Sequence, residues 1–258
     1  MSLFKNASLC GLTLFGVACA ADARGVNLSW RVVAQSTPTA VYPGIEGAKV
    51  CVDAQPEIGC ATTDAHGNFT LKDLPKSTEL VLTVEKDGYI PSLKPIETAD
   101  RFTLVPQPVV MFKAADLPTD LGFAIDTQGS GIVDFFVLVF EGDNQTNPNP
   151  LAGVHVALSP TTGKDPVYFR EPGVFDPALK ATDSFGGTAG LGNLTSGHFF
   201  NVPPGEYTVT FTAPAGYTCA SLTSPVPAWG FPVPGQSAVR VPVRAGYNTA
   251  NIGMHCQP

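Results

Sequence analysis

Residues 47–54 read Gly-Ala-Lys-Val-Cys-Val-Asp-Ala, and this stretch decides the fold class. Its small and aliphatic side chains alternate with polar or sulfur-bearing ones. A half-buried antiparallel strand requires this period of two, because successive side chains of a strand point to opposite faces. We therefore expect the even-numbered side chains of the stretch to face a core, and the odd-numbered ones, Lys49 and Cys51 among them, to face outward.

The residues that follow predict further short antiparallel strands. Alternation resumes at Cys60 after a turn-rich segment, which predicts a hairpin. A second turn precedes Phe69, and Gly67 within it suits a positive φ. The run from Leu80 to Val84 alternates again, and Phe102 with Leu104 suggests the last strand of this half.

The second half repeats the first in outline. Four landmarks recur in the same order: an alternating strand after Gly153, a Thr-Asp turn at Thr182, a strand from Gly205, and a Gly-Tyr pair at Gly216. We infer an internal duplication of one sandwich unit. The purely apolar run 135–140 predicts a strand buried on both faces.

These patterns predict an all-β protein of two tandem immunoglobulin-like or prealbumin-like antiparallel β-sandwiches. The first sandwich is assigned to residues 21–110 and the second to residues 127–258. Residues 111–126 form the connector, with a short helical turn near Ala114 that Gly122 ends.

Composition agrees with many short strands joined by turns. The chain has 258 residues, of which 44% are hydrophobic and only 14% charged, with 26 Gly and 24 Pro. The formal net charge is -7, and lysines and arginines are not clustered. Nucleic acid and anionic membrane surfaces are therefore poor partners for this protein.

Residues 1–20 are interpreted as a signal peptide. Their apolar stretch, from Leu9 to Ala20, is too short to cross a bilayer, and Ala18-Cys19-Ala20 provides the small residues of a cleavage site. A lipoprotein signal acylated at Cys19 is the alternative, and it would be the only link to a membrane. Both interpretations predict an exported protein, periplasmic or extracellular and at the cell surface.

Four cysteines remain after the predicted leader is removed. An even number in an exported chain predicts two disulfides, for which three pairings exist. We choose Cys51–Cys60 and Cys219–Cys256, because each pair then lies within one sandwich.

The motifs together resemble a known family. Gly-Ala-x-Val, Thr-Asp-x-x-Gly-x-Phe, an apolar strand and Gly-Tyr, over residues 44–105, are similar to carboxypeptidase regulatory-like (transthyretin-like) domains. The second half also resembles collagen-adhesin B-type or prealbumin-like repeats, through residues 202–207 and 213–217. The resemblance implies seven-stranded sandwiches that serve as spacer, adhesion or binding modules, usually without chemistry of their own. Some adhesin repeats carry a Lys–Asn isopeptide bond, which we do not expect here because Lys49 and Glu85 face outward.

A search for chemistry predicts no catalytic residue, no metal ligand and no cofactor. Gly-x-Ser-x-Gly, Cys-x-x-Cys and His-x-x-x-His are missing from the sequence. The oxygen-rich side chains of Glu141, Asp143 and Asn144 lie in one loop, and a calcium site there remains an open alternative. A metal-dependent enzyme on a sandwich scaffold is the least favoured alternative, since catalytic residues can converge from distant positions.

Two loops are candidates for recognition. The proline-rich loop 225–234 carries Trp229 and Phe231, and a stiff loop can present an aromatic ring to a sugar or to a protein. The long insert 161–180 carries Tyr168 and Phe169. For Trp229 we favour the alternative in which the side chain folds back onto its own sandwich.

The sequence therefore predicts a non-enzymatic envelope or extracellular protein that binds or adheres. Its partner would be a surface polysaccharide or an envelope protein, reached through loops at the ends of the sandwiches. The alternative is a structural spacer with no ligand.

Overall fold

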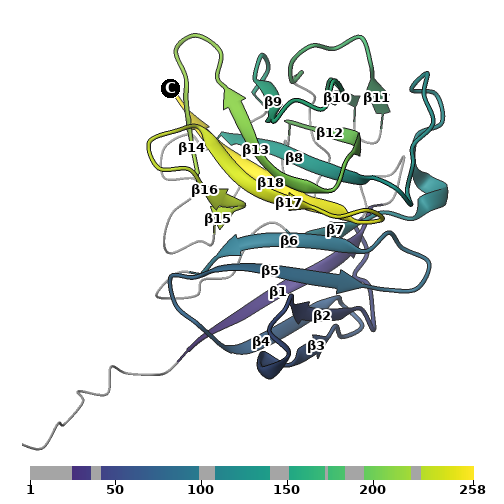
Figure 1. The fold of residues 1–258 in the computed structure, drawn as a ribbon, viewed down its shortest axis with the longest axis vertical. Coiled ribbons are helices and arrows are strands. Elements are labelled where there is room, and N and C mark those ends of the chain that lie inside the picture. Colours follow the sequence, from purple (N-terminus) through teal and green to yellow (C-terminus); the bar gives the residue numbers. More distant parts are fainter. Residues whose placement is uncertain are drawn as a thin grey trace, which may run out of the picture.

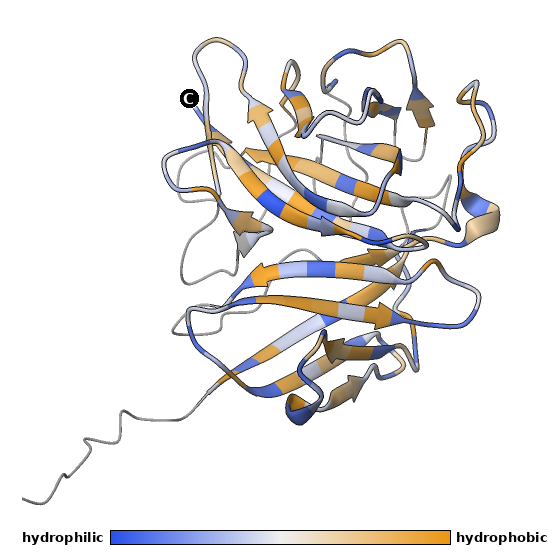
Figure 2. Cartoon of the chain, viewed as in Figure 1, coloured by the Kyte–Doolittle hydropathy of each residue, from blue (hydrophilic) through white to orange (hydrophobic). Residues whose placement is uncertain are grey.

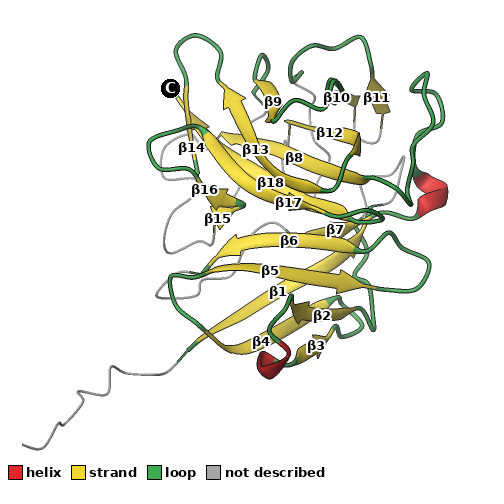
Figure 3. Cartoon of the chain, viewed as in Figure 1, coloured by secondary structure: helices red, strands yellow, loops and turns green. Residues whose placement is uncertain are grey.

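The computed structural model describes residues 25–35, 42–98, 108–139, 151–171, 174–183, 195–221 and 228–258. The predicted leader with Cys19, the Phe102–Leu104 strand and the oxygen-rich loop after Phe140 lie outside the described residues. The described chain consists of β-strands joined by loops and turns, and its helical elements are two 3-10 turns, η1 (Pro56–Ile58) and η2 (Ala114–Asp116), coloured red in Figure 3. The predicted all-β fold of two sandwiches is confirmed.

The first sandwich packs a three-stranded sheet against one half of a much longer sheet (Figure 1). The small sheet has the order β4-β1-β7, with β4 (Asn68–Leu74), β1 (Val26–Ala34) and β7 (Val109–Met111). The facing half of the long sheet has the order β3-β2-β5-β6, with β3 (Cys60–Thr62), β2 (Lys49–Val52), β5 (Glu79–Glu85) and β6 (Ser92–Glu97).

The second sandwich uses the other half of that long sheet. This half has the order β11-β10-β12-β8-β18, with β11 (Val174–Asp176), β10 (Val167–Glu171), β12 (Thr195–Val202), β8 (Gly131–Val139) and β18 (Asn248–Gln257). A four-stranded sheet packs on it in the order β16-β17-β13-β9, with β16 (Phe231–Pro232), β17 (Ala238–Val243), β13 (Gly205–Thr212) and β9 (His155–Ser159). Two further strands, β14 (Thr218–Ala220) and β15 (Ala228–Trp229), pair with β18 and β6.

The pairing pattern confirms the internal duplication. In the first sandwich β1 pairs antiparallel with β4 and parallel with β7, and in the second β8 pairs antiparallel with β12 and parallel with β18. A buried threonine marks the same point in both copies. Thr63 donates its hydroxyl to the carbonyl of Ile45 and accepts from the Ala48 N–H, and Thr182 does the same with Leu151 and Val154.

The two copies are joined edge to edge. Strand β6 of the first sandwich pairs in parallel with β18 of the second, which makes one 11-stranded sheet. The expected sheets were purely antiparallel, whereas β1–β7, β8–β18 and β6–β18 are parallel. Parallel neighbours require long crossover connections, and the strands of the facing sheet supply them in each sandwich.

Strand β8 is a wall shared by both cores, and all nine of its residues are buried, as the apolar run predicts. Phe136 and Leu138 lie in the first core, while Phe135 and Val137 lie in the second. A strand between two cores has no solvent face, so its sequence has no polar alternation. By contrast, β1 faces water on one side, and Figure 2 shows hydrophobic and paler segments alternating along it.

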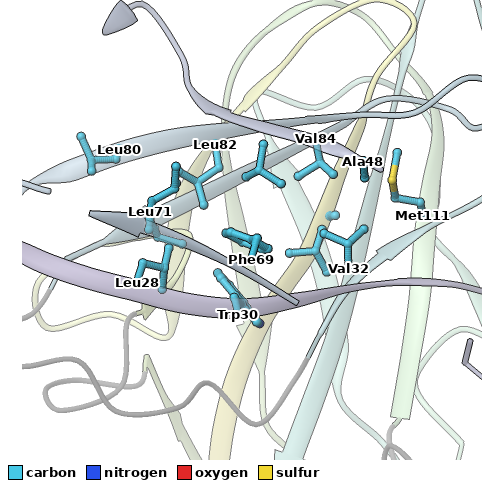
Figure 4. Packing of buried hydrophobic residues seen from close by; sticks show 14 of the residues in the cluster. Leu28, Trp30, Val32, Ala48, Phe69, Leu71, Leu80, Leu82, Val84 and Met111 are labelled. Atoms are coloured by element: carbon cyan, nitrogen blue, oxygen red, sulfur yellow. The ribbon is translucent and has the colours of Figure 1, made fainter. Parts of the chain in front are cut away.

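Figure 4 shows how the first core is filled. Trp30 and Phe69, from the three-stranded sheet, lie opposite Leu82 and Val84 of β5. The even-numbered residues 48, 50 and 52 are buried as expected, but Ala54 is exposed, because the chain turns there with a φ of 56°.

Both predicted disulfides are present. Cys51 and Cys60 are directly paired on β2 and β3, with Cα atoms 4.3 Å apart. Cys219 and Cys256 are directly paired on β14 and β18, with Cα atoms 4.0 Å apart. Each bridge therefore connects neighbouring strands of one sandwich.

Because the two sandwiches share the long sheet, and β8 borders both cores, we predict that they unfold together. Both tryptophans, Trp30 and Trp229, lie in the first core. We expect denaturant unfolding followed by tryptophan fluorescence to coincide with unfolding followed by far-UV circular dichroism, which reports on both sandwiches. A fluorescence midpoint clearly below the dichroism midpoint would show that the first sandwich opens independently.

Candidate functional site

Four polar side chains meet inside the long sheet where the sandwiches join. They come from four adjacent strands, in the order β12-β8-β18-β6, and each is at most 7% exposed. These residues, called the polar cluster below, are His198, Asp134, Asn251 and Lys94. Charged side chains are rarely buried to this degree unless they are paired.

Lys94 belongs to the first sandwich and bonds to the second. Its ammonium nitrogen, Nζ, donates to the carbonyl oxygen of Ala250 at 3.2 Å and also to that of Asn251. It lies 5.6 Å from the centre of the Trp30 ring. Burial lowers the pKa of Lys94 well below its usual value, and the nearby charge of Asp134 opposes this effect only in part.

Asn251 connects three strands because the ladder is irregular at this position. The β8–β18 register shifts between Thr249 and Ile252, and Asn251 has a φ of 53°. Asparagine tolerates this left-handed conformation better than most residues do. Its N–H donates to Asp134 Oδ2 at 3.3 Å, and its Oδ1 accepts from the Val110 N–H of β7 at 3.1 Å. The bulge therefore turns one residue into a link between β8, β6 and β7.

His198 faces Asp134 from within a cage of phenylalanines. Its Nε2 lies 3.3 Å from Asp134 Oδ1. The ring centres of four phenylalanines lie 5.0 to 5.4 Å from the imidazole; they are Phe112, Phe169, Phe175 and Phe200. Nδ1 has no hydrogen-bond partner, so a proton on Nε2 gives the ring its better tautomer here.

Asp134 is thus shared between His198 and Asn251. Its charge also acts beyond the cluster: burial, and then the Asp134 carboxylate, raise the pKa of the Tyr42 hydroxyl. An amine, a carboxylate and an imidazole are the groups of general acid–base chemistry. Here, however, the amine and the carboxylate bond to backbone groups of neighbouring strands, so the arrangement links strands inside the protein.

Sequence reasoning did not find this cluster. Lys94 lies in Ser92-Leu93-Lys94-Pro95-Ile96, and Asp134 is the one charged residue in the apolar strand β8. A lone charge within an apolar run is the signal that marks both positions. It does not show which strands become neighbours.

The four aromatic residues proposed for recognition are all buried. Their exposures are 0% for Trp229, 8% for Phe231, 1% for Tyr168 and 5% for Phe169. The Tyr168 hydroxyl accepts a hydrogen bond from the Val156 N–H at 3.0 Å, and Phe169 stacks on Phe175 with ring centres 4.1 Å apart. The contact role predicted for these rings is corrected, because the described parts of both segments, 167–171 and 228–232, carry strands of the sheets. The favoured alternative for Trp229 is right about its burial, but the ring packs in the first core and not on its own sandwich.

The segment with Trp229 and Phe231 fastens the two sandwiches together. Residues 228–232 are called the strap below. Its first strand, β15, pairs with β6 and places Trp229 opposite Ile96, while β16 pairs with β17 and places Phe231 opposite Arg240. Gly230 joins the two with a φ of 108°, a backbone conformation that favours glycine. The Trp229 ring lies 4.8 Å from that of Phe136 and so completes the first core from the second half of the chain.

Polar contacts on the surface follow the same seam. Arg244 contacts Asp53 at 2.8 Å, and the Tyr247 hydroxyl lies 3.1 Å from Glu85 Oε1. Arg240 pairs with Glu79, and both side chains are more than 40% exposed. Exposed pairs contribute little individually, so the buried cluster and the strap dominate the junction.

Several other polar side chains of the two sandwiches face the solvent. Lys49 and Glu85 are exposed, as expected for residues that form no buried crosslink. Two of the four histidines of the chain, His66 and His155, are exposed as well. Within the described ranges, no group of three or more His, Cys, Asp or Glu is arranged to hold a metal ion. A separate search of the same residues finds no helix with the length and hydropathy to span a membrane.

Comparisons with known proteins give the fold little further context. No protein-family model and no curated protein matches the chain. The Bacillus anthracis TIE protein matches at 15% identity with a TM-score of 0.28, over 90% of this chain and 33% of the TIE chain. GBS52, the minor pilin of Streptococcus agalactiae, matches at 15% identity with a TM-score of 0.28, over 89% of this chain and 96% of GBS52. The chain thus spans about a third of the TIE protein, and the resemblance to carboxypeptidase regulatory-like domains stays a prediction.

The lowered pKa of Lys94 predicts a pH dependence of stability. Between that pKa and the ordinary value of 10.5, the unfolded chain binds more protons than the folded one. The free energy of unfolding should therefore increase as the pH rises through this window. We expect Lys94→Met to flatten this rise at pH values below 10.5, measured by denaturant titration. An unchanged slope in the variant would mean that Lys94 does not cause it.

The linking role of Asn251 predicts a large cost for its removal. Asn251→Ala leaves the buried Val110 N–H unpaired, which costs about 1–3 kcal/mol, and puts alanine at a positive φ. Asn201→Ala is the matched control, because Asn201 has a φ of 55° but bonds at the surface, to the Asp126 N–H. Equal losses in the two variants, measured by denaturant unfolding, would reduce the role of Asn251 to backbone strain.

Proposed function

We propose that this chain is an exported, non-enzymatic protein of the cell envelope or extracellular space, and that it serves as a rigid structural module. The observation that carries the proposal is the continuous sheet through both sandwiches. Tandem domains usually meet through small polar interfaces and move relative to each other. Here a strand pair, the strap and the polar cluster all cross the junction.

The disulfides support export. Both bridges connect neighbouring strands, and Cys256 is fully buried. Stable structural disulfides are typical of oxidising compartments outside the cytosol, which agrees with the predicted leader. The choice between free secretion and a lipid anchor at Cys19 belongs to the same proposal.

The burial of the polar groups supports a structural rather than a catalytic role. The groups of the described chain with the strongest potential for acid–base chemistry, Lys94, Asp134 and His198, lie between strands and bond to one another or to backbone. A catalytic group must reach its substrate within hydrogen-bond distance.

Recognition of a surface polysaccharide or an envelope protein stays a prediction. The rings proposed as its contacts serve the cores, so a spacer role now stands ahead of a binding role. In the described residues, the large apolar side chains that face water are Phe123 at 39% and Val174 at 38% exposed. They are the residues to vary first if a partner is found.

Rigidity is tested by distances between labels on the two sandwiches. Lys72 on β4 and Ala157 on β9 are exposed and belong to different sandwiches, while Lys72 and Lys49 are an exposed control pair within the first. We expect spin labels introduced there through unnatural amino acids to give distance distributions of equal width, because no hinge separates the sandwiches. A broad or two-peaked distribution for the first pair alone would overturn the rigid role.

Export is tested on the native protein. We expect it in the periplasmic, surface or secreted fraction, lacking its first residues and carrying two disulfides by intact mass. Retention of the full-length, reduced chain in the cytoplasm would overturn the proposal.

A further inference from the structure

We propose that Cys51–Cys60 is a site of thiol–disulfide exchange on the folded protein, with the thiolate of a small thiol as its substrate. The second bridge, Cys219–Cys256, stays closed under the same conditions. Such a site adds a chemical reaction to a chain otherwise assigned a structural role, and it follows from where the two bridges lie in the fold.

The two bridges differ most in their access to solvent. Cys60 is exposed and Cys51 is half-buried, whereas Cys219 is 6% exposed and Cys256 is fully buried. The last two belong to the second core, among its aliphatic and aromatic side chains. Exchange begins when a thiolate attacks a disulfide sulfur, so its rate depends on access to that sulfur. Of the two bridges, the first offers this access in the folded protein.

The strand order determines which sulfur a thiolate can reach. One end of the long sheet has the order β5-β2-β3, and β3 is its outermost strand in the described chain (Figure 1). Cys51 and Cys60 are directly paired, so their disulfide runs across β2 and β3. A thiolate displaces sulfur in line with the S–S bond. It can reach the Cys60 sulfur from beyond the sheet edge, whereas an approach to the Cys51 sulfur passes over Thr83 of β5.

The exchange step is a displacement at the Cys60 sulfur. The incoming thiolate forms a new S–S bond with Cys60 as the Cys51–Cys60 bond breaks, and Cys51 leaves as a thiolate that takes up a proton. A second small thiol then attacks the mixed disulfide and releases the Cys60 thiol. Two small thiols are thereby oxidised to one disulfide, while the protein bridge gains two electrons and two protons. The reverse sequence closes the bridge again.

The strands around this bridge have other connections that hold them in place. β2 keeps its ladder to β5, from Lys49 to Val52. Beyond β3, the chain is fastened at Thr63, whose N–H donates to the Ala48 carbonyl at 3.0 Å. The buried Thr63 hydroxyl also donates to the Ile45 carbonyl at 2.6 Å. Both ends of the hairpin therefore stay attached to the first sandwich when the disulfide opens.

The segment that the bridge encloses is the part that reduction can loosen. Cys51 and Cys60 are nine positions apart, and the turn between them carries η1, which has no buried residue and is one of the two red elements of Figure 3. The three residues of β3 are not buried either, and in the described chain β3 pairs with β2. Closing a short loop constrains the unfolded chain less than closing the longer Cys219–Cys256 loop, with its separation of 37. Reduction should therefore open the sheet edge and leave both cores packed.

Reduction of the folded protein, followed by trapping of free thiols, tests the proposal. The exported chain with both bridges formed is incubated with dithiothreitol without denaturant, quenched with iodoacetamide and mapped by peptide mass. We expect alkylated Cys51 and Cys60 to accumulate first. Cys219–Cys256 should open at least about 100-fold more slowly, because exchange there must wait for the second core to open. Equal rates for the two bridges, or a Cys51–Cys60 bridge that reacts only on unfolding, would overturn the proposal.

A monothiol identifies the sulfur that is attacked. With limiting glutathione and rapid alkylation, we expect the mixed disulfide on Cys60 and the alkyl group on Cys51. An adduct found mainly on Cys51 would overturn the assignment of Cys60 as the attacked residue.

Two controls separate exchange on the folded protein from unfolding. After selective alkylation of Cys51 and Cys60, the far-UV circular dichroism and the fluorescence of Trp30 and Trp229, both in the first core, should be unchanged. A spectrum of unfolded chain would contradict exchange within the fold. The double variant Cys51→Ser/Cys60→Ser keeps the buried bridge and should show no alkylation under the same conditions. If Cys219–Cys256 became reactive in this variant, the first bridge would be required for the fold, and the proposal would fail.

Discussion

The constraint on which the rest of the structure depends is the double pairing of β18. This last strand hydrogen-bonds in parallel to β8 of its own sandwich and to β6 of the other, so both ladders must be satisfied by one strand. In a regular ladder, the backbone groups of β18 would all pair with β8 and β6, and none would be free to bond to β7. The bulge at Asn251 releases its N–H and its side chain, and these reach Asp134 and Val110. The junction is therefore held by bonds that only an irregular strand can make.

Burial of Lys94 at this junction combines an unfavourable loss of hydration with favourable contacts. Taking the Lys94 amine out of water is unfavourable, and two carbonyl acceptors, the Trp30 ring and the charge of Asp134 offset only part of that cost. An apolar residue of similar size would fill the same space. The amine differs from an apolar residue because its hydrogen bonds form only when the carbonyl groups of β18 lie in this register beside β6. The two hydrogen bonds of the amine therefore tie the pairing of the sandwiches to one register.

The strap shows how one composition serves two different structures. Prolines around an aromatic pair are typical of a stiff exposed loop and also of a segment that must cross between two sheets. The structure contains the second: Trp229 enters the first core, to which its own half of the chain also contributes Phe136, Leu138 and Ala250, and Phe231 covers the edge of β17. An edge strand left open in one of two similar sandwiches would invite a further strand to pair with it, and the strap closes this edge.

The sequence by itself predicted the alternating strands, the repeated landmarks of the two halves and the chosen pair of disulfides, because these depend on local alternation, on turn residues and on cysteines that lie within one sandwich. It misread as loops the segments that contain β10, β15 and β16. The purely apolar run also identified β8 as a strand without a solvent face. Only the tertiary structure decided that the sandwiches share a sheet, that Lys94 meets Asn251, and that Trp229 belongs to the first core. These contacts join residues more than 100 positions apart, and a periodic pattern records which face of a strand is buried but not which strand lies beside it.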